Sequence, residues 1–424
     1  MSELTKTLGP VSGTAMMLNT VLGAGVLILP GLAAQEIGAM SLWTWVACAL
    51  LSVPLLTMFA ILAGRYPRAG GVGHIAGQAF GAFGNVATSF LFLGAVAVGL
   101  PSIALTGGYY LGSGTGIDPS LGALVLLGLA VAANLTLPGT ASKIGTAVSI
   151  AIAVFLCALA VGSIVVLWGP TGPATPPAPD VPMPTFTLFV AFMLVFFAFT
   201  GWEVAIGISE EFRDPERNVP KAVFASFLIA VAFYILCAGI IIAAGPNAYT
   251  AAPFLAILGP SIGNIGVALM STGTALLIAA NLFAAVWAVS RMLLSLSREG
   301  YLPALLHKTR KGSPRPAVLA AGAIISIGIG LDAADLVDVG NLFATAGQNF
   351  LLIYGISAAA LFRLGRSLVD RAIAVVSIVV VAGLVIVAGL HLFYPSALLV
   401  LAGVLVAVRH RFDRTGPGLA RSGK

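Results

Sequence analysis

Apolar stretches of about twenty residues recur along nearly the whole chain, and they restrict its fold more than any other feature. A helix of about 20 apolar residues crosses the hydrocarbon core of a bilayer. Twelve such stretches are separated by charged or Pro- and Gly-rich breaks, at residues 10–36, 41–64, 84–112, 119–137, 142–168, 186–211, 220–244, 260–290, 315–331, 338–362, 370–390 and 394–409. Only 8% of the residues are charged, too few to cover a soluble surface. We therefore expect an all-α integral membrane protein with twelve transmembrane helices.

The charged residues support the same number of spans. If the N-terminus lies in the cytoplasm, all 21 Lys and Arg side chains fall on the cytoplasmic side. The opposite loops carry acids alone, namely Glu36, Asp118, Asp180, Asp332, Asp335 and Asp338. This is the positive-inside pattern of membrane proteins, and it predicts a multi-pass protein with both termini in the cytoplasm. The basic balance of the chain then needs no nucleic acid, and membrane lipid is the expected contact of the basic loops.

A proline-rich segment divides the spans into groups. Residues 169–185 contain GPTGPATPPAPDVPMP, which predicts an extended external linker. Five spans precede the linker, so the next five cross the membrane in the opposite sense, as in an inverted repeat. The expected units are a first five-helix repeat over 1–168, a second over 186–366, a helical pair over 367–409 and a cytoplasmic tail over 410–424.

The first span of each half is interrupted near its centre. Gly23 and Gly25 lie within the first span, and Thr200, Gly201 and Glu203 lie at a similar depth in the sixth. Glycine weakens a helix by about 1 kcal/mol relative to alanine. Backbone groups that an unwound segment frees need a partner inside lipid. An isolated Gly-x-Gly also fits a packing face or a kink, but matching interruptions in the two halves predict a midplane binding site.

Glu203 is the one charged residue that these spans place well inside the membrane. Burying an ionised side chain there is costly, so intramembrane acids usually face a cavity and have a function. We expect a functional role for Glu203 in preference to structural pairing. The four histidines are dispersed, and no metal-ligand spacing, Ser/His/Asp set or paired intramembrane carboxylates occur. An enzyme is therefore not expected, and neither a cofactor nor a metal is predicted.

Several motifs resemble those of the amino acid–polyamine–organocation transporter family. The sixth span contains FAFTGWE, an aromatic-Ala-Phe-x-Gly-aromatic-acid run, and the loop after it reads EEFRDPERNVPKA. GAGVLILP over 23–30 and SREGYLP over 297–303 are also similar to the family. Within it, RYPRAGGVGHIAGQAFG and VGLP in the third span most resemble bacterial exporters of methionine and branched-chain amino acids.

The resemblance implies a five-plus-five inverted repeat of the LeuT-like fold, with two more helices at the C-terminal end. The substrate would lie between broken helices 1 and 6. N–H groups where the first span restarts suit a carboxylate, and carbonyls where the first halves end suit an α-ammonium group. The residues assigned to substrate binding all lie at these breaks: Val21, Gly23, Ala24, Gly25, Val26, Phe197 and Thr200.

The resemblance also assigns a gate and a coupling residue. Phe197 matches an aromatic residue that covers the substrate, and Glu203 resembles an acid that couples or gates transport in part of the family. A carboxyl group in a medium of low dielectric favours its neutral form, so proton binding there could bias the two conformations of a carrier. Asn281 in the eighth span either orients a polar group or bridges helices, and bridging is favoured.

The sequence thus predicts a secondary active transporter in the bacterial inner (cytoplasmic) membrane. The stretches expected to line the pocket in the third, eighth and tenth spans carry no charge, so neutral hydrophobic amino acids of the Leu, Ile, Val and Met type are the expected cargo. The expected mode is proton-coupled export by alternating access, as an antiporter, with a monomer or homodimer as the assembly. The alternatives are a cationic amino acid or polyamine transporter or exchanger, and an amino-acid sensor that moves nothing.

Overall fold

The structure of the protein is a computed structural model that describes residues 6, 8–23, 25–66, 71–136, 141–169, 185–309, 314–388 and 392–415. For residues 19–20, 141–150, 152, 185–186 and 410–415 it describes the backbone alone. Ala24, the predicted linker from residue 170 to 184 and the predicted tail beyond residue 415 lie outside the described residues.

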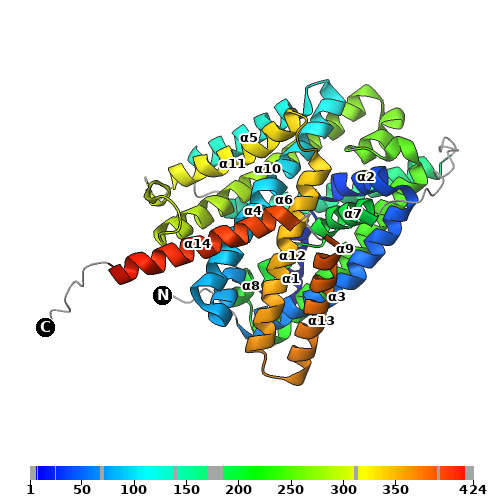
Figure 1. Cartoon of the computed structure of the whole chain (residues 1–424). Helices are drawn as coiled ribbons and strands as arrows, with labels where there is room; N and C mark the ends of the chain where they lie inside the picture. The colour runs from blue at the N-terminus through cyan, green and yellow to red at the C-terminus, as the bar shows by residue number, and fades with distance from the viewer. Residues whose placement is uncertain are drawn as a thin grey trace.

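Helices form the framework of the chain (Figure 1). Their bounds are α1 (Pro10–Val21), α2 (Gly25–Ile37), α3 (Ser41–Arg65), α4 (Gly71–Thr115), α5 (Pro119–Thr136), α6 (Ala141–Leu167), α7 (Thr185–Ala198), α8 (Val204–Ile208), α9 (Pro215–Ala244), α10 (Pro253–Arg298), α11 (Arg315–Ala333), α12 (Val339–Leu364), α13 (Leu368–Ala388) and α14 (Phe393–Thr415). Short 3-10 turns are η1 (Gly38–Met40), η2 (Ser209–Glu211), η3 (Pro246–Ala248) and η4 (Ala304–His307).

Eight helical stretches of the described residues are long and apolar enough to cross a membrane. Shorter apolar helices add the segments Ala153–Leu167, Thr187–Ala198 and Phe393–Arg409. These stretches agree with the all-helical membrane protein that the apolar runs predict. The total of twelve spans and their inverted repeat remain predictions.

The helices pack as two groups with the remaining helices between or beside them. One group contains α1, α2, α3, α7, α8 and α9, and the other contains α4, α5, α10 and α11. α12 runs through the middle of the molecule and packs on α4 of one group and α7 of the other (Figure 1). Direct contact between the two groups is sparse, so a ligand site can form between them.

Two long helices bend at glycines with a left-handed backbone. α4 bends at Gly81 (φ 70°) and α10 bends at Gly263 (φ 65°), so each begins with a separate helical piece of about three turns. The spans predicted to begin at 84 and 260 therefore start after or within that first piece. The backbone angles of Gly81 and Gly263 are not helical, so each glycine separates a short first helix from the longer helix that follows.

The helix after the charged loop also begins earlier than predicted. The span expected at 220–244 starts instead at Pro215, because proline at a first helical position has no N–H that needs a partner. Asp214 lies at the N-cap of α9 in a left-handed conformation (φ 49°), and its side chain makes no cap hydrogen bond.

A main-chain clip joins the first residues of the chain to the segment after α8. The Leu8 N–H donates to the Glu211 carbonyl and the Arg213 N–H donates to the Leu8 carbonyl, each at 2.9 Å. The Phe212 side chain is fully buried against Gly13 of α1. Main-chain hydrogen bonds therefore join the two interrupted helices at their ends nearest the basic end.

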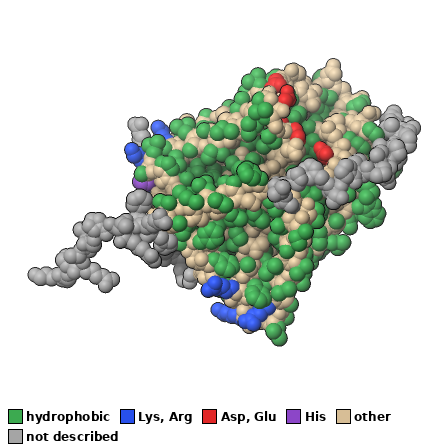
Figure 2. All heavy atoms as spheres, in the orientation of Figure 1, with side chains coloured by type: hydrophobic (Ala, Val, Ile, Leu, Met, Phe, Trp, Pro, Cys, Tyr) green, Lys and Arg blue, Asp and Glu red, His purple; other side chains and the backbone are tan. Residues whose placement is uncertain are grey.

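Charge divides the molecule into two ends. Acidic side chains gather in the upper part of the space-filling view, and basic side chains lie along its lower and left edges (Figure 2). We call the end with Glu36, Asp118, Asp332, Asp335 and Asp338 the acidic end, and the end with Arg65, Arg213, Arg298, Arg363 and Arg366 the basic end. At the basic end Arg65 of α3 forms an ion pair with the buried Asp370 of α13.

Candidate functional site

Two helix breaks face each other in the centre of the structure, where the sequence analysis places them. The first separates α1, which ends at Val21, from α2, which begins at Gly25. The second separates α7, which ends at Ala198, from α8, which begins at Val204. Each break leaves helix-end N–H and C=O groups without partners in the helix, and these groups carry the partial charges of the helix ends.

The break after α7 depends on Gly201. Its φ of 102° lies in the left-handed region that other residues rarely adopt. Thr200 turns back on the end of α7, where its N–H and its hydroxyl both donate to the Phe197 carbonyl, at 3.1 and 2.7 Å. The chain therefore leaves the helix in a fixed direction and restarts three residues after Gly201.

A cavity of about 280 Å³ lies between the two breaks. Its walls include seven of the predicted residues: Val21, Gly23, Gly25, Phe197, Thr200, Glu203 and Asn281. Sites for small molecules usually measure about 300–1,000 Å³, so this one suits a ligand of a few heavy atoms. The structure thus brings together residues that are up to 260 positions apart in the sequence.

Two other predicted residues stand differently. Val26 is fully buried in α2 and does not line the cavity, and its N–H makes a long hydrogen bond of 3.4 Å to the Gly23 carbonyl. Ala24 lies outside the described residues. Of the three residues predicted to offer N–H groups at this break, Ala24, Gly25 and Val26, Gly25 is therefore the one that the structure places in the cavity wall.

The rest of the cavity wall is uncharged and mostly apolar. It comes from one face of α4, from α10 and from α12: Phe92, Ala95, Val96, Gly99, Leu100, Ile103, Ala285, Ala288, Val289 and Phe350. The prediction placed the pocket wall in the third, eighth and tenth spans without naming these residues. Their spacing of three to four along α4 marks one helix face, although the sequence alone does not show which face meets the cavity.

Glu203 is buried and held by two hydrogen bonds. One carboxylate oxygen accepts from the Gly201 N–H at 3.0 Å and from the Tyr354 hydroxyl at 2.9 Å. Tyr354 belongs to α12, and its ring packs edge-on against Phe59 and Phe196. Sequence reasoning missed Tyr354, because nothing in the local pattern of α12 distinguishes it from a core aromatic residue.

Glu203 also lies at a junction between two cavities. A second cavity, of about 410 Å³, extends toward Glu299 at the basic end and is lined in part by Asn85, Ser89 and Ser295. The two cavities share Phe92, Gly201 and Glu203 in their walls. The central cavity therefore adjoins a second cavity on the basic side, and Glu203 lines both.

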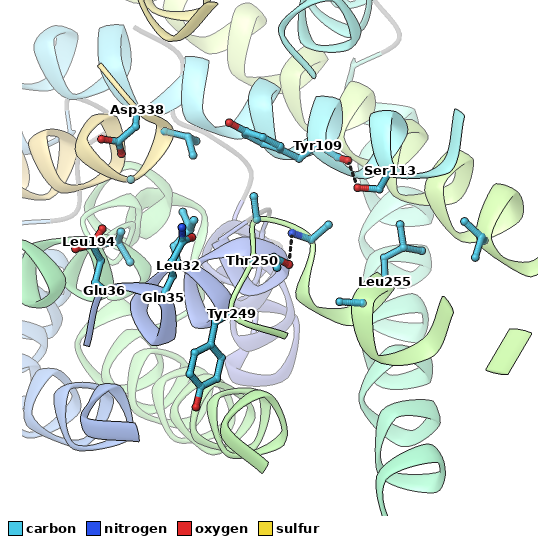
Figure 3. A pocket seen from close by; sticks show the side chains of 16 residues that line it. Leu32, Gln35, Glu36, Tyr109, Ser113, Leu194, Tyr249, Thr250, Leu255 and Asp338 are labelled. Carbon is cyan, nitrogen blue, oxygen red and sulfur yellow. Dashed lines mark hydrogen bonds between the residues drawn. The ribbon is translucent and has the colours of Figure 1, made fainter. Parts of the chain in front are cut away.

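A separate vestibule lies on the acidic side. It has a volume of about 820 Å³, and Glu36, Tyr109 and Asp338 are among the residues around it (Figure 3). It shares no lining residue with the central cavity. Leu194 of α7 faces the vestibule, and Phe197, one turn further along the same helix, faces the central cavity.

Phe197 packs against two other aromatic rings beside the central cavity. The centre of the Phe197 ring lies 5.0 Å from the centre of the Phe343 ring and 6.2 Å from that of the Phe350 ring. On the other side Gly99 lets the ring approach α4, since a Cβ at that position would lie 3.2 Å from it.

The sequence matches a family model described as "Amino acid permease" over residues 8–410. The chain is 28% identical over 404 residues to an uncharacterized amino acid permease, YecA, of Bacillus subtilis, which covers 93% of this chain and 94% of the relative. It is 33% identical over 245 residues to the L-methionine/branched-chain amino acid exporter YjeH of Escherichia coli, or 57% of each chain. It is 28% identical over 330 residues to the putrescine transporter PotE of Haemophilus influenzae, or 74% of each.

Proposed function

The chain belongs to the amino acid permease family, and from this premise we propose that it is a secondary transporter of neutral hydrophobic amino acids of the Leu, Ile, Val and Met type. The observation that carries the proposal is the central cavity, which places two helix breaks beside an apolar wall. Helix breaks can bind the charged backbone of an amino acid, and an apolar wall can accept its side chain. The family is one of transporters, so the protein is not an enzyme.

The two charged groups of the substrate would bind at different breaks. The N-terminal end of α2 at Gly25 offers N–H groups and a positive partial charge to the carboxylate. The ends of α1 and α7 offer carbonyl oxygens to the α-ammonium group, at Val21, Phe197 and Thr200. The Phe197 carbonyl already accepts from both the N–H and the hydroxyl group of Thr200, so the ammonium group could use it only in place of the Thr200 hydroxyl.

The wall around the substrate side chain favours a neutral cargo. Ala95, Val96, Ile103 and Val289 supply aliphatic surface, and Glu203 is the one charged group of the cavity wall. A single carboxyl group does not balance two positive charges of a substrate. The relative named as an L-methionine/branched-chain amino acid exporter is consistent with such a cargo and with export as the direction.

The order of elements supports alternating access through an inverted repeat. An interrupted helix, a plain helix, a helix with a left-handed glycine near its start and two further helices occur in that order from α1 to α6. The same order recurs from α7 to α12, with Gly263 in the place of Gly81. We propose repeats over 1–168 and 186–366, a linker over 169–185, and a helical pair over 367–409 outside the repeats.

The charge of the two ends supports an orientation. Lys and Arg accumulate in cytoplasmic loops of membrane proteins, so we place the basic end and both termini in the cytoplasm of a bacterium. The second cavity, which extends toward Glu299, then lies on the cytoplasmic side of the central cavity, and the vestibule lies on the external side. We propose that Phe197 closes the central cavity toward the vestibule. Glu203, which lines both the central cavity and the second cavity, is the proposed gating and proton-coupling residue.

One observation favours a second candidate function. Glu299 lies in the wall of the cavity that adjoins the central one, so the walls of these two neighbouring cavities hold two carboxyl groups, those of Glu203 and Glu299. A diamine or cationic amino acid could place one positive group near each of them. The similarity to a transporter named for putrescine makes this the alternative cargo.

A binding and flux screen tests the two cargoes. Purified protein is expected to be stabilised against heat by Leu, Ile, Val or Met and not by Arg, Lys or putrescine, because a ligand that binds the folded state raises its unfolding temperature. Proteoliposomes should then transport the ligand that binds, which a sensor would not do. Stabilisation by putrescine and not by leucine would reverse the assignment.

A glycine pair provides the control for that screen. Gly25→Val places a branched side chain at the cavity wall, where its Cβ would meet only the flexible end of Leu29, and is expected to abolish binding while the protein still folds. Gly239→Val makes the same change in α9, where an added Cβ would have no atom of another part of the structure within 4 Å. This variant should bind leucine normally. Normal binding by Gly25→Val would contradict the carboxylate assignment.

A further inference from the structure

One buried tyrosine hydroxyl lies between the two helix breaks. Tyr234 belongs to α9, and its hydroxyl oxygen is 2.8 Å from the Val21 carbonyl oxygen and 2.9 Å from the Ala198 carbonyl oxygen. Val21 is the last residue of α1 and Ala198 is the last residue of α7. A single side-chain atom thus contacts both helix ends that face the central cavity.

The hydroxyl group is held in place by its ring. The centre of the Tyr234 ring lies 5.3 Å from the centre of the Trp45 ring and 5.4 Å from that of the Phe199 ring, and all three side chains are buried. Trp45 and Phe199 also contact each other, at 6.0 Å. Such an aromatic cluster leaves the phenol no alternative position, so the hydroxyl is a fixed reference point for both carbonyl groups.

The hydrogen-bonding capacity of a phenol limits what Tyr234 can do. A hydroxyl has one proton, so it donates to one carbonyl at a time or shares its proton between the two. Each carbonyl has two lone pairs and keeps at least one of them for another donor. An ammonium group carries three N–H donors and could use those that remain.

We propose that Tyr234 is a positioning residue for the α-ammonium site, and this inference rests on the proposed function. Val21 and Ala198 both line the cavity, whereas Tyr234 does not, so it acts through their carbonyl groups. Holding both carbonyls at one fixed atom sets their direction before the substrate arrives. A site whose groups are already oriented binds more tightly, because less freedom is lost on binding.

A second buried tyrosine supplies a matched control. Tyr110 of α4 is also fully buried and donates to a helix carbonyl, that of Leu27, at 2.9 Å. Neither Tyr110 nor Leu27 lines the central cavity. Tyr110→Phe and Tyr234→Phe therefore each keep the ring and remove one buried hydroxyl group, but only one of them lies behind the helix breaks.

The test measures the affinity of both variants for leucine and for two analogues. 3-Methylbutylamine keeps the ammonium group without the carboxylate, and 4-methylpentanoate keeps the carboxylate without the ammonium group. Tyr234→Phe is expected to weaken leucine and amine binding by about tenfold, the effect of one lost hydrogen bond. Binding of 4-methylpentanoate should not change, and Tyr110→Phe should bind leucine like the wild type. Unfolding temperatures show that both variants are folded.

Three results would overturn the inference: leucine affinity unchanged in Tyr234→Phe, equal losses in the two variants, or an equal loss for 4-methylpentanoate. Each of them would leave leucine binding by the wild type intact and so would leave the proposed function standing. A wild-type protein that binds no leucine would instead remove the proposed function, and this inference with it.

Discussion

Glu203 shows how the protein holds a carboxyl group where lipid alone would exclude it. The Gly201 N–H and the Tyr354 hydroxyl both donate to one of its oxygens, and the group faces cavities on two sides. A buried polar group is tolerated when its hydrogen bonds are satisfied. The same arrangement leaves the carboxyl group close to the cavities through which a proton could arrive or leave.

Glu203→Gln separates hydrogen bonding from protonation. The amide oxygen of glutamine can accept the same two hydrogen bonds, but the group can no longer take up or release a proton. We therefore expect leucine flux in proteoliposomes to lose its dependence on pH while leucine–leucine exchange stays close to the wild-type rate. Flux measured between pH 5 and pH 8 checks this.

Glu299→Gln is the control, since it removes a carboxyl group from the basic-end cavity and leaves Glu203 in place. That variant should retain the pH dependence. If the Glu203→Gln profile matched the wild type, the coupling role of Glu203 would have to be abandoned.

Among the helical elements, the clip between the N-terminal segment and the residues after α8 has a mechanical consequence. Leu8 pairs with Glu211 and Arg213 through the main chain, and Phe212 fills the space that Gly13 leaves on α1. α1 and α8 are the halves of the two interrupted helices that lie toward the basic end. We expect them to move together, because separating them would break these hydrogen bonds and expose a buried phenylalanine.

Gly13→Val tests the close packing in this clip. A Cβ at Gly13 would overlap the Phe212 ring, and such overpacking costs about 1–3 kcal/mol. We expect a lower thermal unfolding temperature in detergent for Gly13→Val than for Gly128→Val. Gly128→Val makes the same substitution in α5, so both variants change helix propensity equally. An added Cβ at Gly128 would have no packing neighbour within 4 Å. Equal unfolding temperatures would show that Phe212 can move aside and that the clip is loose.

The whole molecule is organised by the unequal charge of its two ends. Acidic and basic side chains gather at different ends of the molecule, so the charges favour one orientation in the membrane (Figure 2). Positive charge at the cytoplasmic surface is the general rule for loops of this length.

Single cysteines test this orientation. After Cys48, Cys157 and Cys237 are replaced by alanine, Asp335→Cys introduces a thiol at the acidic end and Arg366→Cys introduces one at the basic end; both positions are exposed. A membrane-impermeant maleimide added to intact cells is expected to label the first thiol alone. Labelling of the second after permeabilisation confirms its access. The reverse pattern would invert the proposed topology.

The sequence by itself determined those features that depend only on residues close together along the chain. Twenty-residue apolar runs predict membrane helices, glycine pairs mark where a helix is weak, and the sign of each loop follows from its own composition. Glu203 was identifiable for the same reason, because a lone charge within an apolar run is visible locally. The family predicted from the motifs is confirmed by the match over residues 8–410.

Only the tertiary structure decided which residues meet across the helices. Tyr354 reaches Glu203 from 151 positions away, and Tyr234 contacts Val21 across 213 positions. The apolar wall and the clip at Leu8 likewise depend on which face of a helix turns inward. In a membrane every helix is apolar around most of its circumference, so hydrophobic periodicity gives little information about that face. Close packing of side chains selects it, and packing is a property of the folded chain.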